Sequence, residues 1–196
     1  MITKLFSILA IIAILSTQSF SQSDSAETEM RNPRAFGISG EVGMNSLGSL
    51  LGPVATFYVK PQIALDLGFG LSSVGLRPGV RARYLFSKEK MAYTLGAGLK
   101  YGLGTGEEFV PIEDEKNKTT VHVKIKPSTF VDLTAGTDFL ANNGFLLIAN
   151  VGYSLRVGGK NYEVQSGEFP SKETNQAFRL VFGSGILLSI SAGWGF

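Results

Sequence analysis

The stretch "AFRLVFGSGILLSISAGWGF", residues 177–196, alternates between bulky apolar side chains and small ones. One set of alternate positions carries nearly all of the bulk and reads Phe178, Leu180, Phe182, Ser184, Ile186, Leu188, Ile190, Ala192, Trp194 and Phe196. The intervening positions from Arg179 onward hold mainly glycine and serine. Because side chains of a β-strand point alternately to opposite faces, this stretch is predicted to be a strand with one apolar face and one small, polar face.

The same period of two runs through the rest of the chain, and no helical pattern of useful length accompanies it. Seven further segments alternate in this way, namely 35–45, 51–59, 63–71, 76–86, 91–103, 121–139 and 145–155. Together with the last stretch they predict an all-β fold of eight strands that extends over residues 35–196.

The polar faces of these strands have an unusual composition. With the parity that collects the apolar side chains on one face, no charged residue falls on any of the eight apolar faces. The opposite faces are rich in glycine, serine and alanine, with isolated charges of both signs. The polar face of a soluble β-sandwich would instead be rich in lysine, glutamate and threonine. Small polar residues suit a narrow interior, so the pattern favours an eight-stranded antiparallel transmembrane β-barrel with its apolar face toward lipid.

The predicted connections between strands alternate in length. The connections 60–62, 87–90 and 141–144 are short, and the last of them contains the hairpin-forming pair Asn143-Gly144. The other set is 45–50, 72–75, 104–120 and 156–176, of which the last two are long. Barrels of the bacterial outer membrane have short periplasmic turns and longer outer loops. The lengths therefore agree with an even strand count and an N-terminus on the periplasmic side.

The N-terminus has the layout of a secretory signal. Lys4 precedes the 11-residue apolar run "LFSILAIIAIL" at 5–15, which is followed by the polar stretch "STQSFSQ". A membrane-spanning helix needs about 20 apolar residues, so this run is too short to be an anchor. We expect a signal peptide at 1–21, a flexible polar leader at 22–34 and a barrel at 35–196.

On these features the chain resembles the small eight-stranded outer-membrane barrels of the outer-membrane protein A and X type over residues 35–196. In that class the last strand ends in an aromatic residue, with apolar residues at alternate positions before it. The resemblance implies that Trp194 and Phe196 form a signal read by the barrel-assembly machinery. It also implies localisation in the bacterial outer membrane, with membrane lipid and lipopolysaccharide as neighbours.

Charged residues on the small faces predict what fills the barrel. An eight-stranded barrel is only wide enough for side chains, and an isolated buried charge is costly. The strands supply four acids and five bases, which are Glu41, Asp66, Asp132, Asp138, Arg77, Arg81, Arg83, Lys100 and Arg179. We expect them to form an ion-pair network that plugs the lumen of a monomer.

Composition removes several classes of site. The chain has no cysteine and therefore no disulfide or thiolate metal site, and its formal charge of +2 gives little support for a nucleic-acid partner. His122 is the only histidine and lacks the His-x-Ser pattern of lipid A deacylases. The acidic run "GEEFVPIEDEKNK", 106–118, does not have the spacing of an EF-hand and is interpreted as a solvated loop rather than a calcium site.

The sequence thus predicts a non-enzymatic integral outer-membrane protein, without cofactor or metal, in a structural or surface-interaction role. A small channel or transporter for hydrophobic or small solutes is the alternative, and a lipid-modifying outer-membrane enzyme comes third. The ligands of loops 104–120 and 156–176 cannot be inferred from their residues.

Overall fold

The computed structural model describes residues 34–72, 74–113, 118–159, 161–166 and 183–196. Within these ranges it describes the backbone alone at 107–113, 118–121 and 166, and the side chains everywhere else. Its regular elements are strands: β1 (Phe36–Met44), β2 (Leu51–Lys60), β3 (Ile63–Ser72), β4 (Gly75–Leu85), β5 (Met91–Gly102), β6 (Gly106–Glu113), β7 (Lys118–Ile125), β8 (Ser128–Leu140), β9 (Phe145–Val157), β10 (Tyr162–Ser166) and β11 (Gly185–Gly195). The predicted signal peptide at 1–21 and all of the predicted leader except Arg34 lie outside the described residues. No helix in the described part of the chain is long and apolar enough to cross a membrane.

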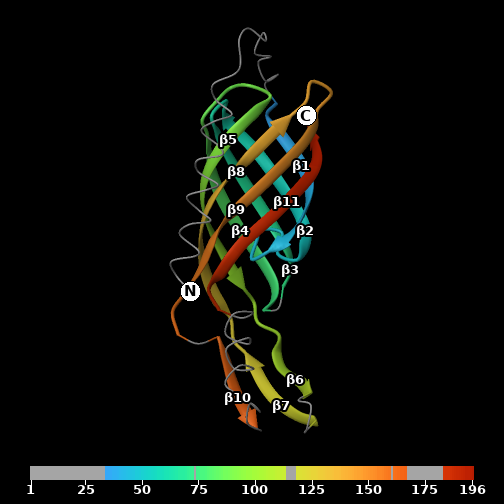
Figure 1. The fold of residues 1–196 in the computed structure, drawn as a ribbon, viewed down its shortest axis with the longest axis vertical. Coiled ribbons are helices and arrows are strands. Elements are labelled where there is room, and N and C mark those ends of the chain that lie inside the picture. The colour runs from blue at the N-terminus through green and yellow to red at the C-terminus, as the bar shows by residue number, and fades with distance from the viewer. Residues whose placement is uncertain (1–33, 73, 114–117, 160, 167–182) are drawn as a thin grey trace, which may run out of the picture.

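Eight strands form a closed barrel in the order β1-β11-β9-β8-β5-β4-β3-β2 (Figure 1). Each neighbouring pair is antiparallel, so the predicted eight-stranded antiparallel β-barrel is confirmed. The barrel closes where β1 pairs with β11, in a register that runs from Gly37 opposite Gly195 to Met44 opposite Leu188. Closure leaves none of these eight strands with an unpaired edge.

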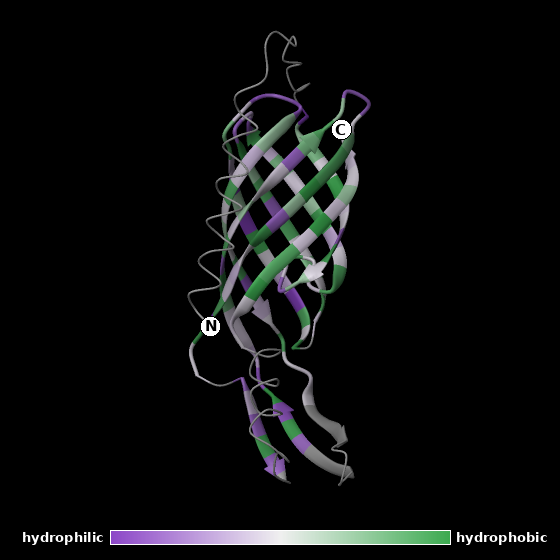
Figure 2. Ribbon diagram, viewed as in Figure 1, coloured by the Kyte–Doolittle hydropathy of each residue, from purple (hydrophilic) through white to green (hydrophobic). Residues whose placement is uncertain are grey.

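The barrel has its apolar side chains outside and its polar side chains inside. Along β1, Ile38 and Val42 are more than half exposed, whereas Ser39 and Glu41 between them are buried. The alternation repeats on the other barrel strands, and Figure 2 shows hydrophobic and hydrophilic residues following one another along them. This is the parity that the sequence predicts, and it is the reverse of the arrangement in a soluble β-protein.

The prediction of one strand over 121–139 is wrong. Val121 to Ile125 belong to β7, which lies outside the barrel, and the barrel strand β8 begins at Ser128. Lys126 and Pro127 separate the two strands. Because the interruption is two residues long, it preserves the period of two and leaves no trace in the hydrophobic pattern. Pro127, which has no backbone N–H to give to a sheet, is the residue that marks the break.

The segments predicted as loops 104–120 and 156–176 also contain strands. β6 pairs with β7, and β7 pairs with β10, to give a separate three-stranded sheet in the order β10-β7-β6. In Figure 1 this projecting sheet extends beyond the end of the barrel that is opposite the C-terminus. The predicted start of the last strand, 177–182, lies outside the described residues, and the described part begins at Gly185.

The two ends of the barrel differ. The short-turn end carries the connections β2–β3, β4–β5 and β8–β9 together with the C-terminus, and the long-loop end carries the projecting sheet and segment 45–50 (Figure 1). Phe196 completes the barrel at the short-turn end, where its backbone N–H donates to the carbonyl oxygen of Phe36 at 2.7 Å. Its ring stacks on Phe36, with 6.5 Å between the ring centroids.

Candidate functional site

The interior of the barrel holds eight of the nine charged residues that the sequence assigns to it. Glu41, Asp66, Arg77, Arg81, Arg83, Lys100, Asp132 and Asp138 are each at most 1% exposed. They come from β1, β3, β4, β5 and β8, always from the parity opposite to the exposed apolar residues. Arg179 lies outside the described residues. These eight residues are four acids and four bases.

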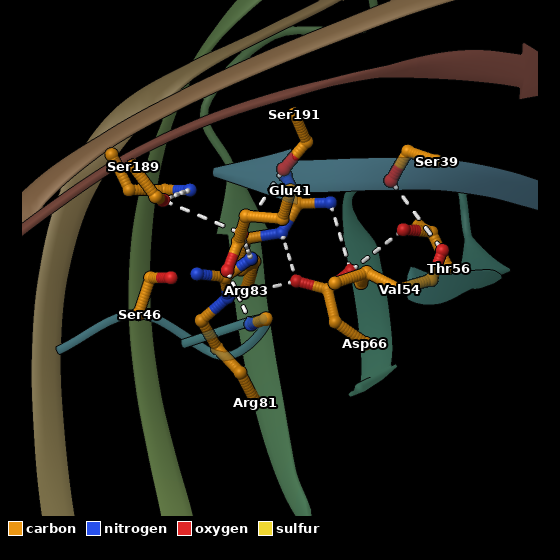
Figure 3. A network of polar contacts seen from close by, with 12 residues as sticks. Ser39, Glu41, Ser46, Val54, Thr56, Asp66, Arg81, Arg83, Ser189 and Ser191 are labelled. Atoms are coloured by element: carbon orange, nitrogen blue, oxygen red, sulfur yellow. Dashed lines mark hydrogen bonds and ion pairs between the residues drawn. The ribbon is translucent and has the colours of Figure 1, made fainter. Parts of the chain in front are cut away.

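Asp66 is the centre of this charge network. Its carboxylate accepts hydrogen bonds from Arg81 Nε at 2.9 Å and from Arg83 Nε and Nη2 at 2.7 and 3.0 Å (Figure 3). The hydroxyl of Thr56 donates a further bond at 2.9 Å. Strand register explains the cluster, because Thr56, Asp66 and Arg81 lie directly opposite one another on β2, β3 and β4. Bonds of this kind between ionised partners are stronger than neutral ones.

Two further acids extend the network across the lumen. Arg83 Nη1 lies 2.7 Å from Asp138 on β8, and the Tyr58 hydroxyl also contacts that carboxylate at 3.2 Å. Arg81 Nη2 lies 3.4 Å from Glu41 on β1. The two arginines thus connect β4 with β8 and β1, which are not its neighbours in the barrel, and cross-link the interior.

Glu41 is held mainly by groups that were not predicted as site residues. Ser189 and Ser191 of β11 donate their hydroxyls to Glu41 Oε2 at 3.3 and 3.0 Å. The backbone N–H of Gly48 donates to Oε1 at 2.6 Å. The serines could have been found from the small, polar face of the last strand, whereas the contact from Gly48 depends on the course of a loop.

The remaining interior charges lie closer to the long-loop end. Lys100 Nζ contacts Asp132 at 2.8 Å and also donates to the carbonyl oxygen of Asn45. The guanidinium of Arg77 lies over the ring of Phe130, 4.4 Å from its centroid. Among the described residues Arg77 forms no ion pair, and its Nε has no hydrogen-bond acceptor. A cation–π contact thus replaces the acidic partner that we expected for Arg77.

Segment 45–50, the connection between β1 and β2, folds into the lumen instead of extending away from it. Residues 46–49 are buried, and Leu47 is only 1% exposed. A Cβ atom added at Gly68 would lie 2.8 Å from Leu47 Cγ, and one added at Gly79 would lie 2.8 Å from Leu47 Cδ1. Both glycines face inward, so the leucine occupies the space that their side chains would fill. We call residues 45–50 the plug segment.

An apolar layer closes the interior at the short-turn end. It consists of inward-facing side chains that are at most 1% exposed, in two clusters: Ala64, Leu85 and Ala92, and Leu140, Leu146 and Ile148. The ion pairs around Asp66 therefore lie between this layer and Leu47. We call this layer the apolar floor.

The other candidates from the sequence lie away from the barrel interior. His122 is in β7 of the projecting sheet, opposite Phe109 and Ser166. In the acidic run, Glu107, Glu108 and Glu113 are in β6, and Asp114 and Glu115 lie outside the described residues.

Next to the projecting sheet, Lys126 forms an exposed ion pair with Glu163 at 2.7 Å, which lowers the pKa of the Glu163 carboxyl. Among the described residues, no cluster of three or more potential metal ligands occurs.

Comparisons with known proteins give no family and a distant similarity to solved structures. No model of a protein family matches the sequence. No curated protein matches it significantly. Among solved structures, the chain is similar to CarO of Acinetobacter baumannii, with 12% identity and a TM-score of 0.43, over 84% of this chain and 98% of that one. The functional argument therefore depends on the geometry of the barrel itself.

Proposed function

We propose that this protein is an integral barrel of the bacterial outer membrane with a structural or surface-interaction role and no enzymatic activity. The observation that carries the proposal is the inverted barrel, with apolar side chains outside and paired charges inside. A bilayer supplies the apolar surroundings that the outer face needs, and a closed barrel satisfies all strand hydrogen bonds without water. The signal peptide and the loop lengths inferred from the sequence agree with export to that membrane.

The filled interior favours a structural role over transport. Ion pairs between residues of five strands cross the lumen. Leu47 occupies lumen space toward the long-loop end, and the apolar floor occupies the lumen at the short-turn end. A water-filled pore needs a wider barrel than eight strands give. The projecting sheet then provides a part of the protein that is available to surface partners.

Purified protein reconstituted into planar lipid bilayers should give no stable ohmic conductance, because both ends of the lumen are filled. A porin of known conductance, inserted from the same detergent, is the control for successful reconstitution. Reproducible single-channel steps from the purified protein would contradict the structural role and favour the channel.

Phe196→Ala should reduce assembly of the barrel in cells without reducing the stability of the refolded protein. The substitution keeps the backbone bonds of residue 196 to Phe36 and removes the aromatic ring that we propose as an assembly signal. We expect refolding in detergent close to the wild type, and several-fold less folded barrel in the outer membrane of cells. Phe57→Ala is the matched control, since Phe57 contacts Phe36 from the other side, with 5.0 Å between centroids. Equal losses in cells for the two variants would contradict a specific role of Phe196.

A further inference from the structure

The plug segment is attached to the barrel in a way that differs from the rest of the interior. Leu47 is its one large buried side chain, and the segment rests in a cradle of glycines on β2, β3 and β4, with Leu47 against Gly68 and Gly79. Added Cβ atoms at Gly52 and Gly70 would collide with the carbonyl oxygen of Gly48. The cradle therefore fits this segment closely, and much of it is glycine backbone.

Polar contacts from barrel side chains hold the plug segment at Gly48 and at Asn45. Glu41 accepts from the Gly48 N–H, and Lys100 donates to the Asn45 carbonyl. Both charged groups also have partners within the barrel, namely Ser189 and Ser191 for Glu41 and Asp132 for Lys100. Loss of the segment would therefore leave neither charge unpaired.

The backbone of the segment is strained at Ser49. Asn45 and Ser49 have φ values of 50° and 60°, and they are the two non-glycine residues with positive φ in the described chain. Such conformations persist where the surroundings enforce them, and they are frequent at switching segments. The conformation of Ser49 is thus enforced by its contacts, whereas Asn45 is of a residue type that adopts positive φ readily.

From these features we propose that the plug segment is a displaceable lid. It leaves the lumen while the barrel stays folded, and its departure opens a polar pocket lined by Glu41, Arg81 and Lys100 toward the long-loop end. The apolar floor still closes the other side, so the opening gives a pocket and not a pore. Water and small hydrophilic solutes enter it, and a solute that binds there shifts the equilibrium toward the open form.

Amide hydrogen exchange of the folded wild-type protein tests the opening directly. We expect the Gly48 amide to exchange at least tenfold faster than mid-strand amides of β3 and β4, and far slower than an unprotected amide. Exchange of Gly48 at the rate of the barrel amides would show that the segment is a fixed part of the core. Exchange at the unprotected rate would show that the segment does not occupy the lumen. Either result overturns the proposal.

A single cysteine provides the second test, since the chain has none of its own. Val54 is 1% exposed, and it lies beside Leu47 at the Gly68 position. In a Val54→Cys background, we expect slow reaction with the charged thiol reagent 2-sulfonatoethyl methanethiosulfonate. Leu47→Ser should accelerate the reaction at least tenfold, whereas Leu50→Ser should leave it unchanged, because Leu50 in the same segment is 58% exposed. Equal rates for the two serine variants would overturn the assignment of Leu47 as the plug.

A reversible lock compares two states of one variant. A Cβ atom at residue 68 would lie 2.8 Å from the position of Leu47 Cγ. That is close to the separation of about 3 Å that disulfide geometry requires between a Cβ atom and the partner sulfur. In the pair Leu47→Cys and Gly68→Cys, oxidation should slow exchange of the Gly48 amide to the rate of the barrel amides, and reduction should restore it. Failure to cross-link, or exchange that is unchanged by cross-linking, would overturn the proposal.

Discussion

Arg83→Met should destabilise the folded barrel by about 3–5 kcal/mol, the cost of breaking a buried ion pair by removing one partner. Arg83 neutralises both Asp66 and Asp138, through contacts of 2.7 Å to each, and all three side chains are buried. Methionine fills much of the same space but leaves the two carboxylates with fewer partners. The measurement is equilibrium unfolding of the refolded protein in urea, followed by the heat-modifiable band or by fluorescence of Trp194.

Arg77→Met is the matched control for this loss. Arg77 lies on the same strand and the same interior face as Arg83 and is equally buried, but it rests on Phe130 and forms no ion pair with the described acids. We expect a loss of about 2 kcal/mol, the value of a desolvated cation–π contact, and hence a smaller loss than for Arg83→Met. The double variant Arg83→Met with Asp138→Asn should lose less than the sum of the single losses. Equal losses for Arg83→Met and Arg77→Met would show that ion pairing does not decide the stability of the interior.

The sequence predicts the barrel well because closure imposes one rule on every strand. A strand that faces apolar surroundings on one side and a narrow interior on the other must alternate, and the parity read from the residues matches the observed burial. The same reasoning places Glu41, Asp66 and Arg83 inside, since a charge on the outer face would be costly. Pairing between particular charges follows from register, which the alternation alone does not give.

Features that depend on the path of the chain between strands, or on depth within the barrel, could not be predicted from the alternation. The plug segment has the composition of an ordinary turn, and its two leucines do not show which of them is buried, since Leu47 is buried and Leu50 is exposed. β7 and β8 share one parity across Lys126 and Pro127, so a period of two cannot show that they belong to different sheets. The apolar floor comes from residues such as Leu85 and Ile148, which lie on the polar parity near strand ends.

Ile190→Arg should destabilise the barrel in lipid by about 2–4 kcal/mol, the range for a cation at the bilayer midplane on the outer face of a barrel. Ile190 is the middle residue of β11, is 61% exposed, and lies between Val42 and Ala149 in register. In water, an exposed residue of this kind would tolerate arginine to within about 0.5 kcal/mol. The size of the stability loss from this one substitution therefore distinguishes a membrane barrel from a soluble one.

Position along the strand gives the internal control. Ile186 is 57% exposed on the same face of β11, but it lies next to the strand end at Gly185. Arginine there should cost about 0–1 kcal/mol, because the penalty falls toward the membrane interface. The comparison requires unfolding of all three proteins, wild type and both variants, from lipid bilayers of one composition. Two equal penalties would indicate a packing defect without dependence on depth. Two negligible penalties would mean that the outer face meets water, and the assignment of this barrel to a membrane would then be wrong.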